Sequence, residues 1–542
     1  MKMRFGLKEI FKMLSERYNN FSKMIIYQVY PRSFFDGNGD GIGDFKGITE
    51  KADHLYELGV NAIWLCPCYK SPNVDNGYDV EDYYQTMDEF GTIEEWKQMQ
   101  RALSERGIKI IMDLVPNHTS DKHKWFVESK KSRDNAYSDF YYWADEPLND
   151  WRSCFGGSAW EYSAERGQYY LHSYAVGQPD LNFDNPKVRE EIKKIIDFWV
   201  SLGVCGFRID VIDQISKDFE NKRNSFGPNL HKYINELFGR EGLENIYTVG
   251  ECWAKDIAEI KRHCAEERRE LVSLFQFDHI DHGRNGRFES APFTVEQIAR
   301  DLDRWQSEFV KNDIIHTLFT DNHDQPRFIS RFGNDTDLRY ESATMFASMV
   351  YLLRGIPFIY QGQEFGMTNS YHSDFSEFRD VENIHYYNEN YGKMPENELM
   401  ARINFGSRDN ARRPLAWSDA QYGGFSTALP WIDTYSRYKE INLESDKKSQ
   451  RSVFEFYKKL LQFRKESDVV LFGDYRCVML NDFAFAYERE KNGKKVLVVC
   501  NFDRESEINV GNFSGECVLS NYTKRDSVNG KYAPYETAVF SI

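Results

Sequence analysis

The sequence lacks the long apolar runs and the surplus of basic residues that would suit a membrane or a nucleic acid. No apolar run reaches about 18 residues, so no segment is expected to span a bilayer. The first 22 residues carry charges throughout and show neither an apolar core nor a small-residue cleavage site, so they do not predict a secretory signal. Lys and Arg number 69 against 85 Asp and Glu, and the net charge of −16 argues against both partners.

Cysteine is present, but not in the pattern of a disulfide framework or a zinc site. The nine cysteines are odd in number, and Cys66 and Cys68 are separated by only one residue. We therefore expect free thiols and a cytoplasmic protein. The sequence also has no Walker loop, no GxGxxG and no HExxH, so no organic cofactor is expected.

What the sequence does contain is a regular alternation of short apolar runs and amphipathic stretches. Such an order predicts a (β/α)8 barrel, in the TIM-barrel class of α/β folds. The helical stretches include 94–106, 186–202, 295–311 and 341–353. The eight predicted strands are 25–31, 60–65, 109–115, 205–210, 246–251, 273–277, 315–320 and 356–360.

Long segments that break the alternation predict further parts of the molecule. Residues 119–184 follow the third strand and are expected to form an inserted irregular domain, and residues 365–446 after the eighth strand read as loop-like. After residue 467, short β-type runs predict a C-terminal antiparallel β-sandwich. The expected organisation is an N-terminal extension (1–22) in which residues 7–14 have some helical periodicity, a catalytic barrel (23–118 and 185–467), the insert (119–184) and the C-terminal domain (468–542).

Acidic residues stand at the ends of several predicted strands. Asp113, Asp210 and Glu251 each end a strand, and Asp324 follows another by a few residues. A single acidic residue in such a place usually caps a helix or forms a turn. Four of them after four strands of one barrel are expected to meet at the mouth where barrel active sites lie.

The pairing of Arg208 with Asp210 suits the chemistry of glycoside hydrolysis, which needs one ionised and one protonated carboxyl. Residues two apart on a strand point to the same side, so the guanidinium would hold Asp210 ionised as a nucleophile. Glu251 lies between Gly250 and Cys252, a less polar setting that would raise its pKa and suit an acid/base. The alternative is a buried ion pair that only organises the barrel.

The loop DGNGDGIGD predicts a site for a hard cation. Oxygen-bearing residues alternate with glycines in it, as in the first half of a calcium-binding loop. The twelfth position of an EF-hand is occupied by Gly47, so the loop is not an EF-hand. The expected Ca²⁺ ligands are Asp36, Asn38, Asp40, Ile42 and Asp44, and the alternative is a glycine-rich turn without metal.

Taken together, these segments resemble glycoside hydrolase family 13, the α-amylase family, and within it the oligo-1,6-glucosidase group. The resemblance runs from about residue 25 to the C-terminus. It is carried by DLVPNH (113–118), GFRIDVID (206–213), VGEC (249–252), TDNHD (320–324) and QPDLN (178–182). Further matching stretches are YQVYPRSFFD, NGYDVEDYY, FGGSAWEY, QPRFISRFGND, GIPFIYQGQE and DNARRPLAW.

The resemblance implies a role for each matching residue. Asp210 would be the nucleophile, Glu251 the acid/base and Asp324 the stabiliser of the transition state. Asp79 and Arg412 would pair and close the glucose pocket, which gives exo-action on a terminal glucose. The resemblance also implies a calcium site at the loop described above. The residues implied to bind substrate are Tyr78, Asp79, His118, Phe155, Gln178, Arg208, Val211, His323 and Arg412.

Several activities of this family fit the sequence. Val211 after the nucleophile is typical of members that prefer α-1,6 linkages, so the sequence predicts a retaining exo-acting α-glucosidase acting on isomaltose-type oligosaccharides, with α-1,4 linkages also open. Trehalose-6-phosphate hydrolase and a sucrose-acting isomerase or hydrolase share the same core motifs. A catalytically dead transporter heavy chain is disfavoured, because the three acids are present. Besides the oligosaccharide substrate no partner is expected, and a monomer is favoured.

Overall fold

The computed structural model describes residues 21–542, and the helical periodicity predicted at 7–14 lies outside them. Eight parallel strands form one sheet, in the order β11-β10-β9-β5-β2-β1-β13-β12. The hydroxyl of Thr317 in the last strand donates to the carbonyl of Leu274 in the first (2.9 Å), which closes the barrel. All eight predicted strands are confirmed. They are β1 (Ile26–Val29), β2 (Ala62–Leu65), β5 (Lys109–Leu114), β9 (Gly206–Ile209), β10 (Tyr247–Gly250), β11 (Ser273–Leu274), β12 (Thr317–Leu318) and β13 (Ile356–Tyr360).

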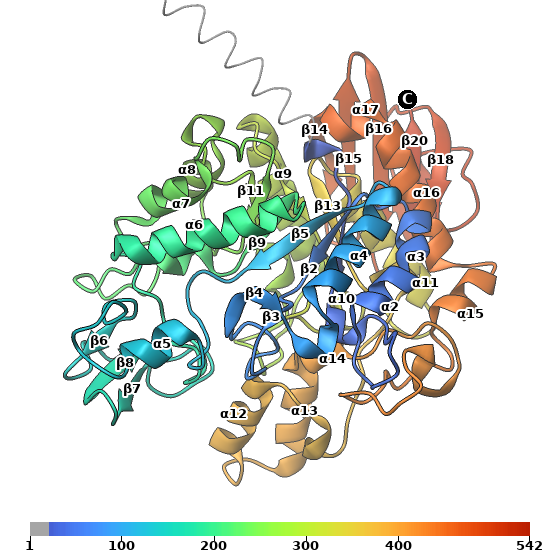
Figure 1. The fold of residues 1–542 in the computed structure, drawn as a ribbon. Coiled ribbons are helices and arrows are strands. Elements are labelled where there is room, and N and C mark those ends of the chain that lie inside the picture. Colours follow the sequence, from blue (N-terminus) through green and yellow to red (C-terminus); the bar gives the residue numbers. More distant parts are fainter. Residues whose placement is uncertain (1–20) are drawn as a thin grey trace, which may run out of the picture.

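Helices cover the outside of this barrel (Figure 1), and their first residues explain where they begin. Thr92 and Thr294 form capping boxes at the starts of two of them, and Asn185 caps a third in front of a proline. The last of the four helices that we predicted is buried on almost every side, because it lies between the barrel and the C-terminal sheet. The four are α4 (Ile93–Glu105), α6 (Pro186–Ser201), α9 (Val295–Lys311) and α11 (Arg339–Tyr351).

The two insertions lie at the carboxyl ends of the strands. The first carries α5 (Lys124–Ser129) and a small antiparallel sheet of β6 (Trp143–Ala144), β8 (Gln168–Leu171) and β7 (Trp160–Ser163), which projects from the barrel in Figure 1. The second was predicted to be loop-like, and this was wrong in part. It contains a helical hairpin, α12 (Val381–Asn390) and α13 (Glu396–Gly406), with its own small apolar cluster. Only Asn383 of α12 is buried, so the helix shows little apolar periodicity in the sequence.

The C-terminal part is antiparallel, as predicted, and is joined to the barrel through α16 (Val453–Glu466) and α17 (Asp468–Phe472). A five-stranded sheet and a two-stranded sheet share one apolar cluster, in which Leu497 and Val499 of the first sheet pack with Ile508 and Tyr532 of the second. Across residues 21–542, no helix is both long and apolar enough to cross a membrane. The strands are β14 (Asp474–Leu480), β15 (Ala484–Lys491), β16 (Lys494–Asn501), β17 (Ser506–Ile508), β18 (Glu516–Ser520), β19 (Gly530–Tyr532) and β20 (Thr537–Ser541).

Candidate active site

A cavity of about 410 Å³ opens at the carboxyl end of the barrel, where the predicted acids meet. Asp210 directly follows β9, Glu251 directly follows β10, and Asp324 follows β12 by six residues. All three line the cavity. Of the other predicted site residues, Tyr78, His118, Phe155 and Val211 line it as well.

Arg208, inside β9, joins three of the acidic residues. Its Nη1 donates to Asp210 Oδ1 (2.7 Å) and to Asp113 Oδ1 (2.8 Å), and its Nη2 donates to Glu251 Oε2 (2.5 Å). The arginine side chain is 2% exposed, so these are contacts in a region from which water is largely excluded. One guanidinium therefore fixes the positions of both Asp210 and Glu251, and the predicted contact between Arg208 and Asp210 is present.

Burial raises the pKa of Asp210 and of Glu251, and the guanidinium of Arg208 opposes this in both. Their mutual contact contributes to the pKa of each, and the negative charge of Asp324 raises that of Glu251 further. Burial therefore outweighs the guanidinium at Asp210, contrary to the expectation that Arg208 would keep this carboxyl ionised. The two carboxyls bind two nitrogens of one guanidinium, so they lie on the same side of the cavity.

Asp324 is held in the opposite state. Burial alone would raise its pKa, but His323, Arg408 and Arg412 outweigh this and hold the pKa well below its usual range. Arg412 Nη2 donates to Asp324 Oδ1 (2.8 Å), and Arg408 Nη1 lies 3.3 Å from the same oxygen. Asp324 is therefore ionised, unlike a carboxyl whose pKa is raised by burial alone.

The stacked rings of His323 and Tyr78 contact two of the acidic residues, Asp324 and Asp113. The two rings stack with centroids 5.3 Å apart and an interplanar angle of 8°. Burial lowers the pKa of His323 to about 3, so the ring is neutral. The amide of Gln28 donates to Nδ1 (2.8 Å), which places the proton on Nε2, 3.0 Å from Asp324 Oδ2. Tyr78 in turn donates to Asp113 Oδ2 (2.9 Å). Hydrogen bonds therefore connect Gln28 through His323 and Tyr78 to Asp113.

The ion pair expected between Asp79 and Arg412 is wrong. Both carboxylate oxygens of Asp79 accept backbone N–H groups, from Val74 and from Asp75 (2.9 Å each). Arg412 instead binds Asp324 and Asp380.

The charged pair that lines the cavity is instead Asp75 with Arg408, whose charged groups lie 3.3 Å apart. Each of them lies four residues before the residue that was predicted. Arg408 and Arg412 are four residues apart, at the start and end of α14 (Asp409–Arg412), so both face the same side. The sequence motif alone therefore pointed to the right helical turn but to the wrong arginine.

His118, Gln178 and Phe155 lie near the pair of Asp75 and Arg408. Burial lowers the pKa of His118 to about 4, so it is neutral. Gln178 is fully buried behind the cavity, where its amide donates to Asp75 Oδ2 (3.1 Å). The ring of Phe155 lies under the guanidinium of Arg408, 5.1 Å from its centroid. Gln178 therefore positions Asp75, whereas His118 and Phe155 form part of the wall.

Val211 has an unusual backbone for a β-branched residue. Its φ is +36° and its ψ is +48°, in the left-handed region that favours glycine. In this conformation its N–H points to Glu251 Oε2 at 3.3 Å, and its side chain lines the cavity. The strained turn therefore presents a backbone donor to the acid/base candidate.

Several residues that line the cavity were not predicted from the sequence. Trp253 is 41% exposed and its ring stacks on Phe277, with centroids 5.2 Å apart. No motif marked it, although its place two residues after Glu251 put it near the site. Other cavity residues come from segments far apart in the chain: Cys154, Tyr174, Gln214, Asp281, Arg284, Arg287, Asn322, Gln325 and Glu382.

The predicted calcium loop folds back on itself away from this cavity. Asp36 accepts backbone N–H groups from Asn38, Gly39 and Gly41, and the hydroxyl of Ser426. Asp44 caps α2 (Phe45–Glu50) through Oδ1, while its Oδ2 is buried and has no hydrogen-bond partner in the described part of the chain. A buried carboxylate oxygen without a partner fits a hard cation, so the donor chemistry of the loop suits Ca²⁺.

Comparisons with known proteins agree with this geometry. The family model for the alpha-amylase catalytic domain matches residues 28–473. The oligo-1,6-glucosidase of Parageobacillus thermoglucosidasius is 42% identical over 554 aligned positions, which cover 96% of this chain and 98% of that protein.

Two crystal structures are similar over nearly the whole chain. The trehalose-6-phosphate hydrolase of Bacillus licheniformis has a TM-score of 0.89 and 39% identity, and covers 96% of this chain and 99% of its own. The trehalulose synthase of Pseudomonas mesoacidophila has a TM-score of 0.92 and 36% identity, with the same two coverages. The chain therefore belongs to the α-amylase family, glycoside hydrolase family 13, and is a glycoside hydrolase.

Proposed function

We propose that this enzyme is a retaining, exo-acting α-glucosidase that removes terminal α-1,6-linked glucose from short oligosaccharides such as isomaltose. The observation that supports the proposal most strongly is the meeting of three carboxyls in one cavity. Asp210 and Glu251 share Arg208, and Asp324 is kept ionised beside them.

The reaction would be a double displacement. The carboxylate of Asp210 attacks the anomeric carbon while Glu251 gives its proton to the glycosidic oxygen, and the bond between that carbon and oxygen breaks. A water then gives a proton to Glu251 and displaces Asp210 from the sugar, which restores both groups. The ionised Asp324 would stabilise the positive charge that develops on the ring.

Arg208 and Val211 would support the same two steps. The guanidinium reaches both carboxyls, so it balances whichever of them carries the negative charge at each stage. The N–H of Val211 favours the ionised form of Glu251 that is left after the proton transfer.

The charged pair in the cavity wall supports exo-action. Asp75 and Arg408 line the cavity and pair with each other, so together they would stop a longer chain from passing between them. A cavity of about 410 Å³ is at the small end of the range for ligand sites, roughly 300–1,000 Å³. It suits a short substrate that enters end-on better than a long polymer lying across the site.

The charges around the cavity favour a neutral sugar over a phosphorylated one. Six carboxyls line it (Asp75, Asp210, Glu251, Asp281, Asp324 and Glu382) against three guanidiniums (Arg284, Arg287 and Arg408), a formal balance of −3 if all are ionised. Each arginine already pairs with a carboxylate, Arg284 with Asp281, Arg287 with Glu382 and Arg408 with Asp75. A phosphate would have to break one of these pairs, so trehalose-6-phosphate hydrolysis is the second candidate.

A substrate panel tests the proposal. Purified enzyme is incubated with isomaltose, panose, maltose, sucrose and trehalose 6-phosphate, and the first product is followed by NMR. We expect the highest kcat/KM on isomaltose-type substrates and release of α-glucose. β-Glucose as first product would contradict retention. A higher kcat/KM on trehalose 6-phosphate, or a sucrose isomer as main product, would replace the proposed substrate with one of the two alternatives.

Calcium and location complete the proposal. We propose that the loop around Asp36 and Asp44 binds Ca²⁺ in a structural role, supported by the unpartnered Asp44 Oδ2. Removing divalent cations with EGTA should then lower Tm, and Ca²⁺ but not Mg²⁺ should restore it. An unchanged Tm would contradict the site.

We also propose a cytoplasmic location, supported by nine free cysteines. Cell fractionation would test it, and enzyme recovered mainly outside the cell would contradict it.

A further inference from the structure

Two histidines and two glutamates form a cluster on the outer ring of helices, apart from the catalytic cavity. His231 belongs to α7 (Leu230–Phe238), and Glu259 and His263 lie one turn apart on α8 (Ile257–Cys264). Glu270 lies in the segment between α8 and β11. None of the four lines the catalytic cavity, so the cluster has no part in the proposed glycoside hydrolysis.

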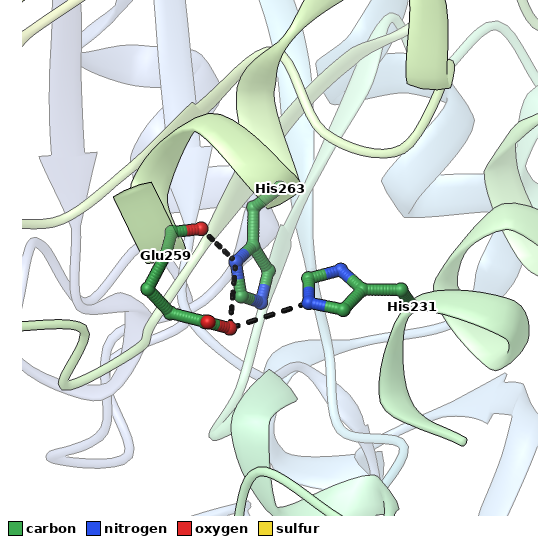
Figure 2. Close-up of side chains that lie close together, drawn as sticks. All are labelled: His231, Glu259 and His263. Carbon is green, nitrogen blue, oxygen red and sulfur yellow. Dashed lines mark hydrogen bonds and ion pairs between the residues drawn. The ribbon is translucent and has the colours of Figure 1, made fainter. Parts of the chain in front are cut away.

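The three side chains of α7 and α8 face one another, as Figure 2 shows. One ligand atom from each of His231, Glu259 and His263 lies within 4.8 Å of the others. His231 Nε2 lies 3.2 Å from Glu259 Oε1. His263 Nδ1 lies 3.7 Å from the same oxygen, but it also contacts a backbone carbonyl, so Nε2 is the atom of this ring that would bind a metal. A tetrahedral zinc ion bound at about 2.0–2.1 Å would place its ligand atoms about 3.4 Å apart, so small side-chain shifts would form the site.

Each histidine of the cluster has a hydrogen-bond partner on one ring nitrogen, as the histidine ligands of metal ions usually have. His231 Nδ1 lies 2.7 Å from Glu270 Oε2, and Arg268 donates to the other oxygen of Glu270. His263 Nδ1 lies 2.9 Å from the backbone carbonyl of Glu259. Both contacts match the rule that a metal-binding histidine donates its second N–H to a carboxylate or a carbonyl.

The carboxylate of Glu259 is oriented in the same way. Arg262 donates to its Oε2 (3.1 Å), while its Oε1 faces the two imidazoles. The side chain of Glu259 is 20% exposed and that of His231 is 11% exposed, so water has access on one side of the cluster. A bound ion could therefore keep a water molecule as a further ligand.

Ion pairing alone explains only part of this arrangement. A protonated His231 between Glu259 and Glu270 would satisfy both carboxylates without a metal. It would leave His263 Nε2 buried with no hydrogen-bond partner among residues 21–542, on a side chain that is 0% exposed. A buried nitrogen lone pair without a partner is costly, and a metal ion beside it would remove that cost.

We propose that His231, Glu259 and His263 bind one divalent transition-metal ion of the zinc type. Two imidazoles and one carboxylate favour Zn²⁺ over the harder Ca²⁺ and Mg²⁺. The ion would join α7 to α8, which follow consecutive strands of the barrel, so its role is structural.

Zinc binding to the full-length enzyme tests the proposal. The enzyme is freed of metal with EDTA, titrated with ZnCl₂ by calorimetry, and its metal content is measured after gel filtration. We expect one Zn²⁺ per chain and a rise of about 2 °C or more in Tm at saturating Zn²⁺. His231→Gln and His263→Gln should abolish both effects, and Glu270→Gln should weaken binding by about 10–100-fold.

Matched controls separate this site from other ligands in the chain. A second group, His372, Glu377 and Asp433, also has close ligand atoms, so His372→Gln is the control variant and should bind Zn²⁺ like the parent. Co²⁺ in place of Zn²⁺ should give visible bands without the thiolate charge-transfer absorption that cysteine ligands produce. The proposal is overturned by an absence of binding, by unchanged binding in both histidine variants, or by thiolate absorption.

Discussion

Asp75 offers the sharpest test of the substrate site, because the structure places this aspartate in the cavity wall, whereas the sequence motif had pointed to Asp79. Asp75 lines the cavity, pairs with Arg408 and accepts the amide of Gln178, whereas Asp79 lies behind it and accepts two backbone N–H groups. The change to test is Asp75→Asn, with Asp79→Asn as its matched control. Both variants remove one negative charge and keep nearly the same side-chain volume.

The expected effect of Asp75→Asn follows from the loss of a charged hydrogen bond to a sugar hydroxyl. Such a bond contributes about 1.5–3 kcal/mol. At about 1.36 kcal/mol for each tenfold change, kcat/KM should fall by about 10–150-fold. Because the side chain lies at the cavity wall and Arg408 keeps Asp324 and Asp380 as partners, Tm should change little.

Asp79→Asn should lower the stability of the enzyme more than its activity. An amide offers one acceptor oxygen where the carboxylate offered two, so one buried backbone N–H loses its partner, at a cost of about 1–3 kcal/mol in stability. Burial also raises the pKa of Asp79 to about 6, so part of its charge is already lost near that pH. We expect a clear fall in Tm and a smaller fall in kcat/KM than in Asp75→Asn.

Steady-state kinetics on isomaltose and thermal unfolding of both variants decide between the two assignments. The reasoning is refuted if Asp75→Asn keeps kcat/KM within about threefold of the parent while the folded Asp79→Asn enzyme loses more. That result would mean that Asp79 reaches the sugar during catalysis and that the contacts described here are rearranged by substrate.

Three further changes test the catalytic roles. Asp210→Asn should lower kcat by at least about a thousandfold, with Tm at or above that of the parent because a buried group with a raised pKa is replaced by a neutral one; substantial activity would remove it as nucleophile. Glu251 must be protonated to act as the acid, so its raised pKa should keep kcat/KM high up to a higher pH than an ordinary glutamate would. Glu251→Gln should remove the fall of kcat/KM at alkaline pH. If the residual activity of this variant still falls at the same alkaline pH, Glu251 is not the acid/base. Trp253→Ala should raise KM about 2–10-fold with little change in kcat, as expected for loss of a stacking surface; an unchanged KM would show that Trp253 does not meet the substrate.

The strands and most barrel helices could be predicted because their causes are local. Apolar runs of strand length, caps such as Thr92 and a proline after Asn185 all lie in the sequence next to the elements that they begin or form. The place of the proposed catalytic acids could also be predicted, since a residue that ends a strand of a parallel barrel lies at its carboxyl end. The helix α12 escaped prediction because it is mostly exposed and carries almost no buried face.

The sequence alone determined the barrel, the family and the set of acids that could react. Only the tertiary structure decided which charges pair, because Asp75 with Arg408 and His231 with Glu270 join segments 333 and 39 residues apart. The periods of strands and helices specify which face a side chain occupies. Two aspartates or two arginines that lie four residues apart, such as Arg408 and Arg412, have nearly the same local sequence pattern, so the pattern does not distinguish between them. The choice between them depends on the loops packed against them, and that information is distributed over the whole fold.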